Sequence, residues 1–146
     1  MSGRARELKW REESVGLTRM DAYSAFSEKV KETKRKLLKL LTAIKDEGKT
    51  IAGYGAPGKG NTLLNYCGIR TDFIDYTVDR NPYKHGRYTP GTHIPIYPPD
   101  KIKETKPDYV FILPWNLKEE IMKQNSFIRE WGGKFIIPIP EPTVVD

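Results

Sequence analysis

A glycine-rich stretch at residues 53–62, GYGAPGKGNT, has the residue types that bind phosphate in many proteins. It contains four glycines and Lys59, and it stands between an apolar segment and a segment with helical spacing. Gly53, Gly55 and Gly58 match the dinucleotide fingerprint G-x-G-x-x-G. Glycines allow a tight turn and a close approach of the backbone to phosphate, and the N-terminus of the following helix offers free N–H groups. The stretch therefore predicts a phosphate-binding loop.

The stretch has two other interpretations. It nearly matches the P-loop of nucleotide hydrolases, but Gly60 stands where Ser or Thr would hold magnesium, so hydrolysis is not expected. It could also be a purely structural turn. Lys59 argues against that, because a cation at the start of a helix opposes the helix dipole unless an anion binds there. Asp79 ends the next predicted strand, close to the usual place of the acid that accepts ribose hydroxyls.

A basic and aromatic loop at residues 79–93 is the second candidate binding segment. Arg80, Lys84 and His85 carry groups that bind phosphate, and Tyr88 could stack on a base or a sugar. The alternative is an ordered surface loop pinned by its prolines and tyrosines, and the sequence leaves both interpretations open. Together with Trp115, the candidate substrate-binding residues are Gly55, Ala56, Pro57, Gly58, Lys59, Gly60, Asn61, Thr62, Asp79, Arg80, Asn81, Lys84, His85, Tyr88 and Trp115.

Trp115 follows an apolar strand and either walls a pocket or packs in the core. His85 and His93 are the two histidines, and neither has a Cys or a carboxylate at metal-ligand spacing. No metal site is therefore expected. No residue is placed beside a nucleophile as a general base, so no catalytic residue is predicted.

The segments around these residues alternate between strand and helix patterns. This alternation predicts a mostly parallel sheet of about five strands with helices on its faces, and a ligand at the carboxyl ends of the strands. Pro138 lies inside the last strand segment and suggests a sheet edge or a strand end. The expected strands are residues 50–55, 73–79, 93–97, 108–114 and 134–139, and the expected helical segments are 58–66, 101–106 and 116–131, the last capped by Asn116.

The N-terminal part of the chain has a different pattern. Residues 1–20 are polar with a few apolar anchors and predict an arm or a former interdomain linker. Residues 21–48 predict a long amphipathic helix that ends at Gly48. The remaining residues, 49–146, predict a single α/β core.

Composition excludes several classes of protein. The 146 residues suffice for one domain with a real core, and no apolar run is long enough to span a bilayer. No signal peptide is visible, so a cytoplasmic protein is expected. Most of the +6 net charge falls in residues 1–49 with mixed signs, which does not predict nucleic-acid binding. Cys67 is the one cysteine, which excludes an internal disulfide and predicts a buried thiol.

Four blocks of the sequence resemble the C-terminal domain of SAM-dependent sugar C-methyltransferases, which methylate nucleotide-linked deoxy-keto-sugars. The resemblance runs from about Gly16 to the C-terminus, and the blocks occur in the family's order. They are GYGAPGKGNTLLNYCGI, DRNPYKHGRYTPGTHIPI, PDYVFILPWNLKEEI and WGGKFIIPIPEP.

The resemblance implies a Rossmann-like three-layer domain that completes a nucleotide-sugar site. The family's zinc-binding part, which is rich in cysteine, and its SAM-binding part, which carries a catalytic Glu-His pair, have no counterpart in these residues. The resemblance thus implies that this chain alone is inactive and binds no cofactor itself, with SAM serving the complete enzyme. The implied partners are a nucleotide-sugar and a SAM-binding domain in cis or in trans, and a homo-oligomer is possible.

The sequence also leaves open two functions outside the methyltransferase family. A small NAD(P)-type dinucleotide-binding protein or oxidoreductase would explain the fingerprint and Asp79. An interaction module that has lost its ligand would explain the fold without a site.

Overall fold

The computed structural model describes the backbone of residues 10–146 and the side chains of residues 28–146. The chain divides into two compact units, residues 1–35 and residues 36–146. The second unit contains the whole sheet and both cores. Among the described residues, no helix combines the length and the apolar character needed to cross a membrane.

Helix α1 (Trp10–Asp46) is the first element and belongs in part to each unit. It begins well before the expected residue 21, and Gly48 follows its end with φ +77. Residues 10–20 were expected as a polar arm but are helical, because they hold helix formers such as Glu, Arg, Leu and Met and no proline. Residues 1–9 of that arm lie outside the described residues.

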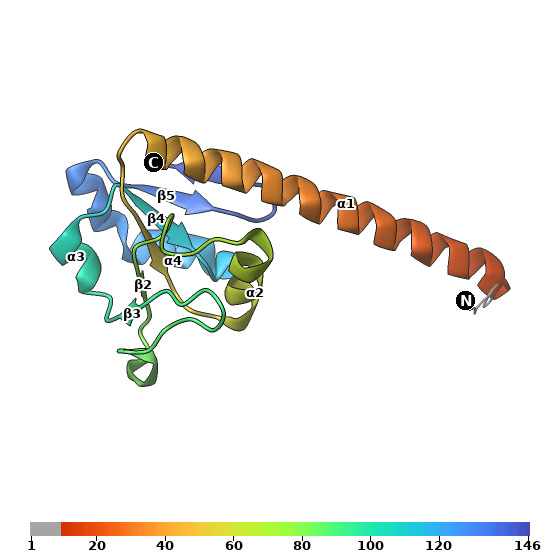
Figure 1. Cartoon of the computed structure of the whole chain (residues 1–146), viewed down its shortest axis with the longest axis horizontal. Coiled ribbons are helices and arrows are strands. Elements are labelled where there is room, and N and C mark those ends of the chain that lie inside the picture. The colour runs from red at the N-terminus through yellow and green to blue at the C-terminus, as the bar shows by residue number, and fades with distance from the viewer. Residues whose placement is uncertain (1–9) are drawn as a thin grey trace. The chain divides into compact units, whose positions relative to one another are not determined.

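A six-stranded sheet with the order β3-β2-β1-β4-β5-β6 forms the centre of the second unit (Figure 1). All neighbouring strands pair in parallel except β5 and β6, which are antiparallel. The predicted α/β fold with a mostly parallel sheet is confirmed, with six strands in place of about five. The strands are β1 (Ile51–Tyr54), β2 (Thr77–Val78), β3 (Ile96–Tyr97), β4 (Tyr109–Ile112), β5 (Lys134–Ile137) and β6 (Thr143–Val145).

Several strands are shorter than expected. Only Thr77 and Val78 of the expected strand 73–79 pair as a strand, because the N–H groups of Phe73 and Ile74 both bond to the carbonyl of Arg70 in a turn. Strand β5 ends at Ile137, one residue before Pro138. Pro138 therefore marks a strand end rather than a sheet edge, because a proline cannot donate to the ladder.

The sixth strand was missed by the sequence pattern. The expected last strand ended at residue 139, and no strand was expected after it. The chain instead turns, and residues 143–145 pair with β5. The signal was present, because Thr, Val and Val are β-branched residues that favour strands.

The prediction of one helix over residues 116–131 is wrong, because three short helices occupy this segment. Asn116 lies inside the first of them and does not cap α4, whose preceding residue is Leu117. The break follows from Asn125, which is buried and whose side-chain N–H donates to the carbonyl of Ile121, in competition with helix continuation. The helices after α1 are α2 (Gly58–Cys67), η1 (Pro82–Lys84), α3 (Lys101–Thr105), η2 (Trp115–Leu117), α4 (Lys118–Gln124) and η3 (Ser126–Trp131).

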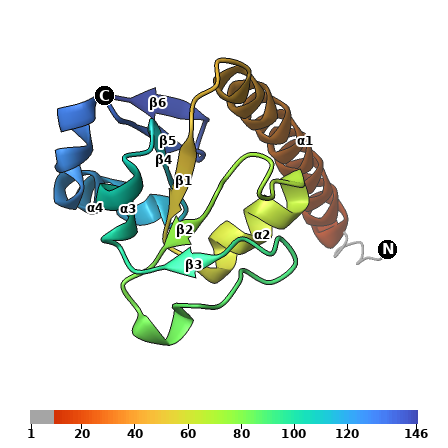
Figure 2. The ribbon, with the colours of Figure 1, turned by 60° about the vertical axis from the view of Figure 1, so that its left-hand side comes forward.

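The helices form layers on the two faces of the sheet. The last turns of α1 and helix α2 cover one face, and α3 and α4 cover the other (Figure 2). The first core includes Leu37, Leu41 and Ile44 of α1 together with the buried Cys67 of α2. The second core packs Ile102 and the α4–η3 segment on the opposite face. This three-layer arrangement leaves the carboxyl ends of β1, β2 and β4 at one edge.

Three glycines, one each in β1, the loop after it and α2, allow close contacts with neighbouring residues. A side chain at Gly53 would lie 2.8 Å from the Thr77 hydroxyl, and Gly55 has φ +91 with Pro114 2.8 Å from its missing Cβ. A Cβ at Gly60 would lie 2.9 Å from the Cβ of Leu113. Close packing of the helix on the sheet therefore depends on Gly60. Gly58, the last glycine of the fingerprint, has open space around the same point.

Replacing Gly60 with Ala is expected to lower the free energy of unfolding by about 1–2 kcal/mol, because the clash with Leu113 outweighs the gain in helix propensity. Gly58→Ala is the matched control on the same helix and should leave stability unchanged or slightly higher. Urea denaturation of both variants measures the difference. Equal stabilities would show that α2 does not pack as closely as described.

The buried Tyr76 should make the free energy of unfolding depend on pH in the alkaline range. Its hydroxyl lies 2.5 Å from the Thr105 hydroxyl of α3, and burial raises the pKa of the Tyr76 phenol above the ordinary 10.0. Above pH 10 the unfolded chain loses this proton while the folded chain retains it. The stabilisation is therefore complete below pH 10 and is lost as pH rises through the folded pKa.

The measurement is urea denaturation of the unmodified chain and of Tyr76→Phe between pH 8 and pH 11. The variant should be about 1 kcal/mol less stable at pH 8, because it lacks the hydrogen bond. It should then lose less stability than the unmodified chain as the pH rises. Parallel curves for the two proteins would contradict the assignment.

Candidate functional site

A hollow of about 210 Å³ lies where the ends of β1, β2 and β4 meet. The chain order reverses between β1 and β4, so this is the switch point at which open α/β sheets bind ligands. The hollow lies on the α4 side of the sheet. Its lining residues are Tyr54, Gly55, Ala56, Pro57, Asp79, Arg80, Lys84, Pro114, Leu117, Glu120, Ile121 and Gln124.

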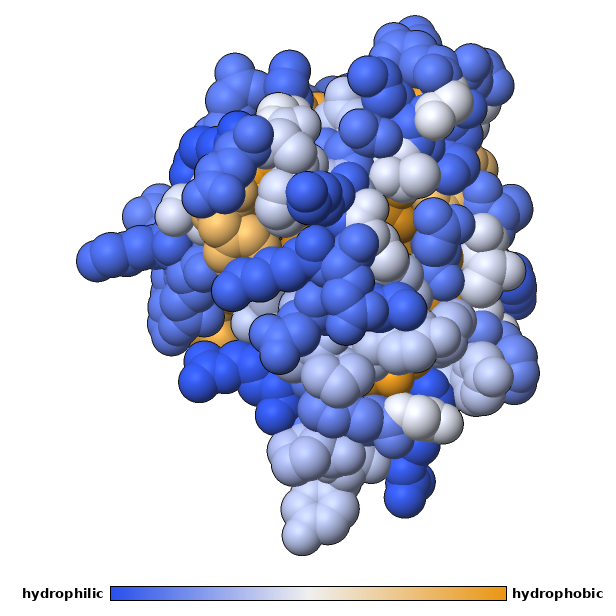
Figure 3. Space-filling view, turned by 90° about the vertical axis from the view of Figure 1, so that its left-hand side faces the viewer, coloured by the Kyte–Doolittle hydropathy of each residue, from blue (hydrophilic) through white to orange (hydrophobic). Residues whose placement is uncertain are grey.

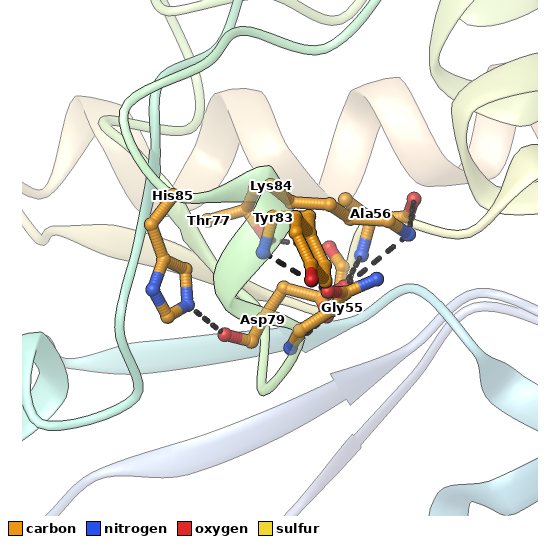
Figure 4. Close-up of polar contacts among 8 residues, drawn as sticks. Gly55, Ala56, Thr77, Asp79, Tyr83, Lys84 and His85 are labelled. Carbon is orange, nitrogen blue, oxygen red and sulfur yellow. Dashed lines mark hydrogen bonds and ion pairs between the residues drawn. The ribbon is translucent and has the colours of Figure 1, made fainter.

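Asp79 connects the glycine loop to the loop that follows β2 (Figure 4). Its Oδ2 accepts the N–H of Ala56 at 2.9 Å, and its Oδ1 accepts the N–H of Asn81 at 2.8 Å. The ammonium of Lys84 lies 3.7 Å from Asp79 Oδ2 and donates to the carbonyl of Ala56 at 3.0 Å. We call Ala56, Asp79, Asn81 and Lys84 the Asp79 cluster. It holds both loops with charge-assisted hydrogen bonds.

The glycine loop has few N–H groups left for a ligand. The N–H of Gly55 donates to the carbonyl of Val78 at 2.5 Å, and the N–H of Ala56 is bound by Asp79. Pro57 has no N–H. The carbonyl of Gly55 accepts the hydroxyl of Thr77 at 2.6 Å. Donors therefore remain only in the first turn of α2, at residues 58–60, where no described side chain provides a cap.

The candidates on α2 lie outside the lining of this hollow. Lys59 is exposed and its ammonium lies 5.0 Å from the centre of the Trp115 ring, as a cation–π pair. The hydroxyl of Thr62 donates to the carbonyl of Gly58 within the helix, and Asn61 accepts a hydrogen bond from Thr92. Gly60 is buried against the sheet. Each of these residues thus makes a contact within the domain, and a role in binding stays a prediction.

The loop at residues 80–93 is held in place by contacts of its own residues, and its role in binding stays a prediction. Asn81 accepts the N–H of Tyr83 and caps η1, and Nε2 of His85 lies 2.5 Å from the carbonyl oxygen of Asp79. Tyr88 stacks on His93 with 4.4 Å between ring centres. These contacts order the loop. Arg80 and Lys84 from the same loop reach the hollow.

A second hollow of about 390 Å³ adjoins the first. The two share Tyr54, Arg80 and Gln124 as lining residues. The ammonium of Lys103 lies 4.9 Å from the centre of the Phe127 ring, and both residues line this second hollow. Its remaining lining residues are Pro99, Asp100 and Asn125.

Sequence reasoning missed much of this lining. Tyr54 is the last residue of β1, and its position at a strand end was a usable signal. Glu120 and Gln124 lie four apart on α4, hence on one face, and the Gln124 amide donates to Glu120 at 3.3 Å. Because the segment 116–131 is not one continuous helix, its sequence pattern did not predict which face carries Glu120 and Gln124. Nothing in the sequence pattern placed Lys103 beside Phe127.

Comparison with known proteins adds the family. A family model described as the C-methyltransferase C-terminal domain matches residues 1–140. The C-methyltransferase NovU of Streptomyces niveus is 37% identical over 139 residues, which is 95% of this chain and 33% of NovU. The chain thus spans about a third of the length of this relative.

A distant structural likeness was also found. A UDP-D-quinovosamine 4-dehydrogenase from Vibrio fischeri superposes with a TM-score of 0.43 at 23% identity, covering 60% of this chain and 75% of that one. A likeness this distant carries no information on function. The match over residues 1–140 and the identity to NovU are decisive, and the chain belongs to the C-methyltransferase C-terminal domain family.

Proposed function

We propose that this chain is the substrate-binding part of a SAM-dependent C-methyltransferase and that it holds a nucleotide-linked sugar. The observation that carries the proposal is the hollow at the switch point of the sheet, in a chain of this family. The methyl donor and the base that would enolise a keto-sugar belong to a SAM-binding domain, in cis or in trans. The chain matches only 33% of NovU, which leaves room for such a domain in the relative.

The chemistry of the lining supports a sugar as ligand. Tyr54, Pro114 and Leu117 present apolar surface, which suits the C–H faces and methyl group of a deoxysugar. Glu120 and Gln124 present hydrogen-bonding groups on the same side of the hollow. A mostly apolar wall with a few polar groups is the common form of small-molecule sites.

The dinucleotide alternative is weaker. In that alternative the carboxylate of Asp79 would accept ribose hydroxyls. Here one of its oxygens binds the N–H of Ala56 and the other binds the N–H of Asn81, while Lys84 lies beside it. The residue that made the dinucleotide interpretation attractive is therefore engaged in holding the two loops.

Calorimetric titration of the purified chain with dTDP, NADH and SAM in turn separates these functions. The proposal expects heat of binding with dTDP and none with NADH or SAM. Binding of NADH alone would favour the oxidoreductase alternative. Binding of SAM would mean that the methyl donor uses this domain, which would contradict the proposal.

Asp79→Ala tests the structural role of the Asp79 cluster. Loss of two charge-assisted hydrogen bonds and one ion pair should lower the free energy of unfolding by about 2 kcal/mol, measured by urea denaturation. Asp75→Ala removes a charge from an exposed residue nearby and is the matched control, expected within about 0.5 kcal/mol of the unmodified chain. Equal stability of the two variants would show that Asp79 does not hold the loops.

A further inference from the structure

The two hollows meet at Arg80 and make one groove along the carboxyl edge of the sheet. Tyr54 and Gln124 line both of them as well, so these three side chains mark the place where the hollows adjoin. The first part lies over the ends of β1 and β4. The second part runs toward α3 and η3, which contribute Lys103 and Phe127. A ligand that occupies both parts must pass Arg80.

The two parts of the groove differ in charge. The first part is lined by the carboxylates of Asp79 and Glu120 and by the cation of Lys84, with Arg80 at its junction with the second part. The second part has Arg80 and Lys103, opposed among its described lining residues by Asp100 alone. No ion pair of Arg80 or Lys103 is found within the described part of the chain. The second part therefore favours an anion, while the first favours a neutral group.

The sizes of the two parts point the same way. The first part, at about 210 Å³, is the smaller of the two and has room for one pyranose ring. The second part is larger, at about 390 Å³, and Phe127 offers an aromatic ring beside the Lys103 cation. Aromatic rings stack on bases, and lysine and arginine bind phosphate.

The glycine loop is a poor place for the diphosphate. Its Gly55 and Ala56 N–H groups are bound to Val78 and Asp79, and Pro57 has none. The first turn of α2, with Lys59, is the remaining rival site, but it does not line the groove. Among the described residues, the unpaired cations that do line the groove are Arg80 and Lys103.

We infer that the groove binds the nucleotide-linked sugar in a fixed direction, with the sugar in the first part and the diphosphate between Arg80 and Lys103 in the second. This inference rests on the proposed function. It moves the phosphate contact from the glycine loop, where the fingerprint would place it, to Arg80 on the loop after β2 and Lys103 on α3. The side of the molecule that carries α3 is mostly hydrophilic, with apolar atoms visible only in small areas (Figure 3). Such a surface suits a charged small ligand.

Four single variants test the phosphate contact by calorimetric titration with dTDP, with UDP in parallel. Arg80→Gln and Lys103→Gln should each weaken binding about tenfold, because each removes one charge-assisted contact. Lys123→Gln removes an exposed cation of α4 outside the groove and should stay within about twofold. Lys59→Gln should also stay within about twofold if the α2 rival site is unused. Thermal unfolding of each variant checks that it folds.

The outcomes are distinct. Weakening by Lys59→Gln without weakening by Arg80→Gln and Lys103→Gln would overturn the inference but keep the proposed function. Failure of the unmodified chain to bind dTDP or UDP at millimolar concentration would overturn both. Equal weakening by all four variants would mean a non-specific charge effect and would also overturn the inference.

Leu117→Trp tests the direction of the ligand. Leu117 is 49% exposed and lines the first part, so a larger side chain there fills the hollow without entering the core. The unmodified chain should bind a dTDP-linked 4-keto-6-deoxyhexose more tightly than dTDP. The variant should lose that difference while its affinity for dTDP stays unchanged. A variant that loses affinity for dTDP itself would place the nucleotide in the first part and contradict the inference.

Discussion

The hydrogen bond from the Ala56 N–H to the carboxylate of Asp79 is the contact on which the site depends. It connects the loop after β1 to the loop after β2, and Lys84 reinforces it by binding both the carboxylate and the Ala56 carbonyl. Both loops follow parallel strands at the same edge of the sheet. The contact therefore fixes the position of the residues that line the groove there. It also aligns Arg80, the next residue in the chain, with the opening between the two hollows.

The same contact explains why a familiar motif has an unfamiliar role here. A glycine-rich loop binds phosphate when its N–H groups are free. In this chain the N–H groups at residues 55 and 56 serve neighbouring strands and loops, and a proline follows them. Gly60, rather than the last glycine of the fingerprint, permits the close contact between α2 and the sheet. The loop thus connects β1 to α2 with two of its N–H groups already bonded, while the groove beside it contains the cations Arg80 and Lys103, unpaired among the described residues.

The order of elements was predictable from sequence because apolar strands alternate with helical patterns along the chain. Gly48 and Gly68 both end helices in the left-handed conformation, as glycines after helices commonly do. Contacts between residues distant in sequence determine the helix ends and strand pairings that the sequence pattern did not predict. The buried Asn125 breaks a helix that periodicity alone would continue, and the pairing of residues 143–145 with β5 needs a turn that no local motif announces.

The candidate site was predictable at the level of segments and less so at the level of atoms. Strand ends converge, so the glycine loop and Asp79 lie near one another as expected, whereas Trp115 lines neither hollow and packs against the second core. Whether an N–H group is free, or which cation lacks a carboxylate, depends on neighbours far away in the sequence. Lys103 and Phe127 come together from different helices and carry no signal in either segment.

Mapping of dTDP binding by amide chemical-shift changes in the isotope-labelled chain tests the central claim most directly. We predict that the largest shifts fall at Arg80, Lys103 and residues 124–127, with small changes at residues 58–62. Shifts concentrated at the first turn of α2 would contradict the account, because they would return the phosphate to the glycine-rich motif. Absence of shifts at any residue at saturating dTDP would remove nucleotide-sugar binding from this domain.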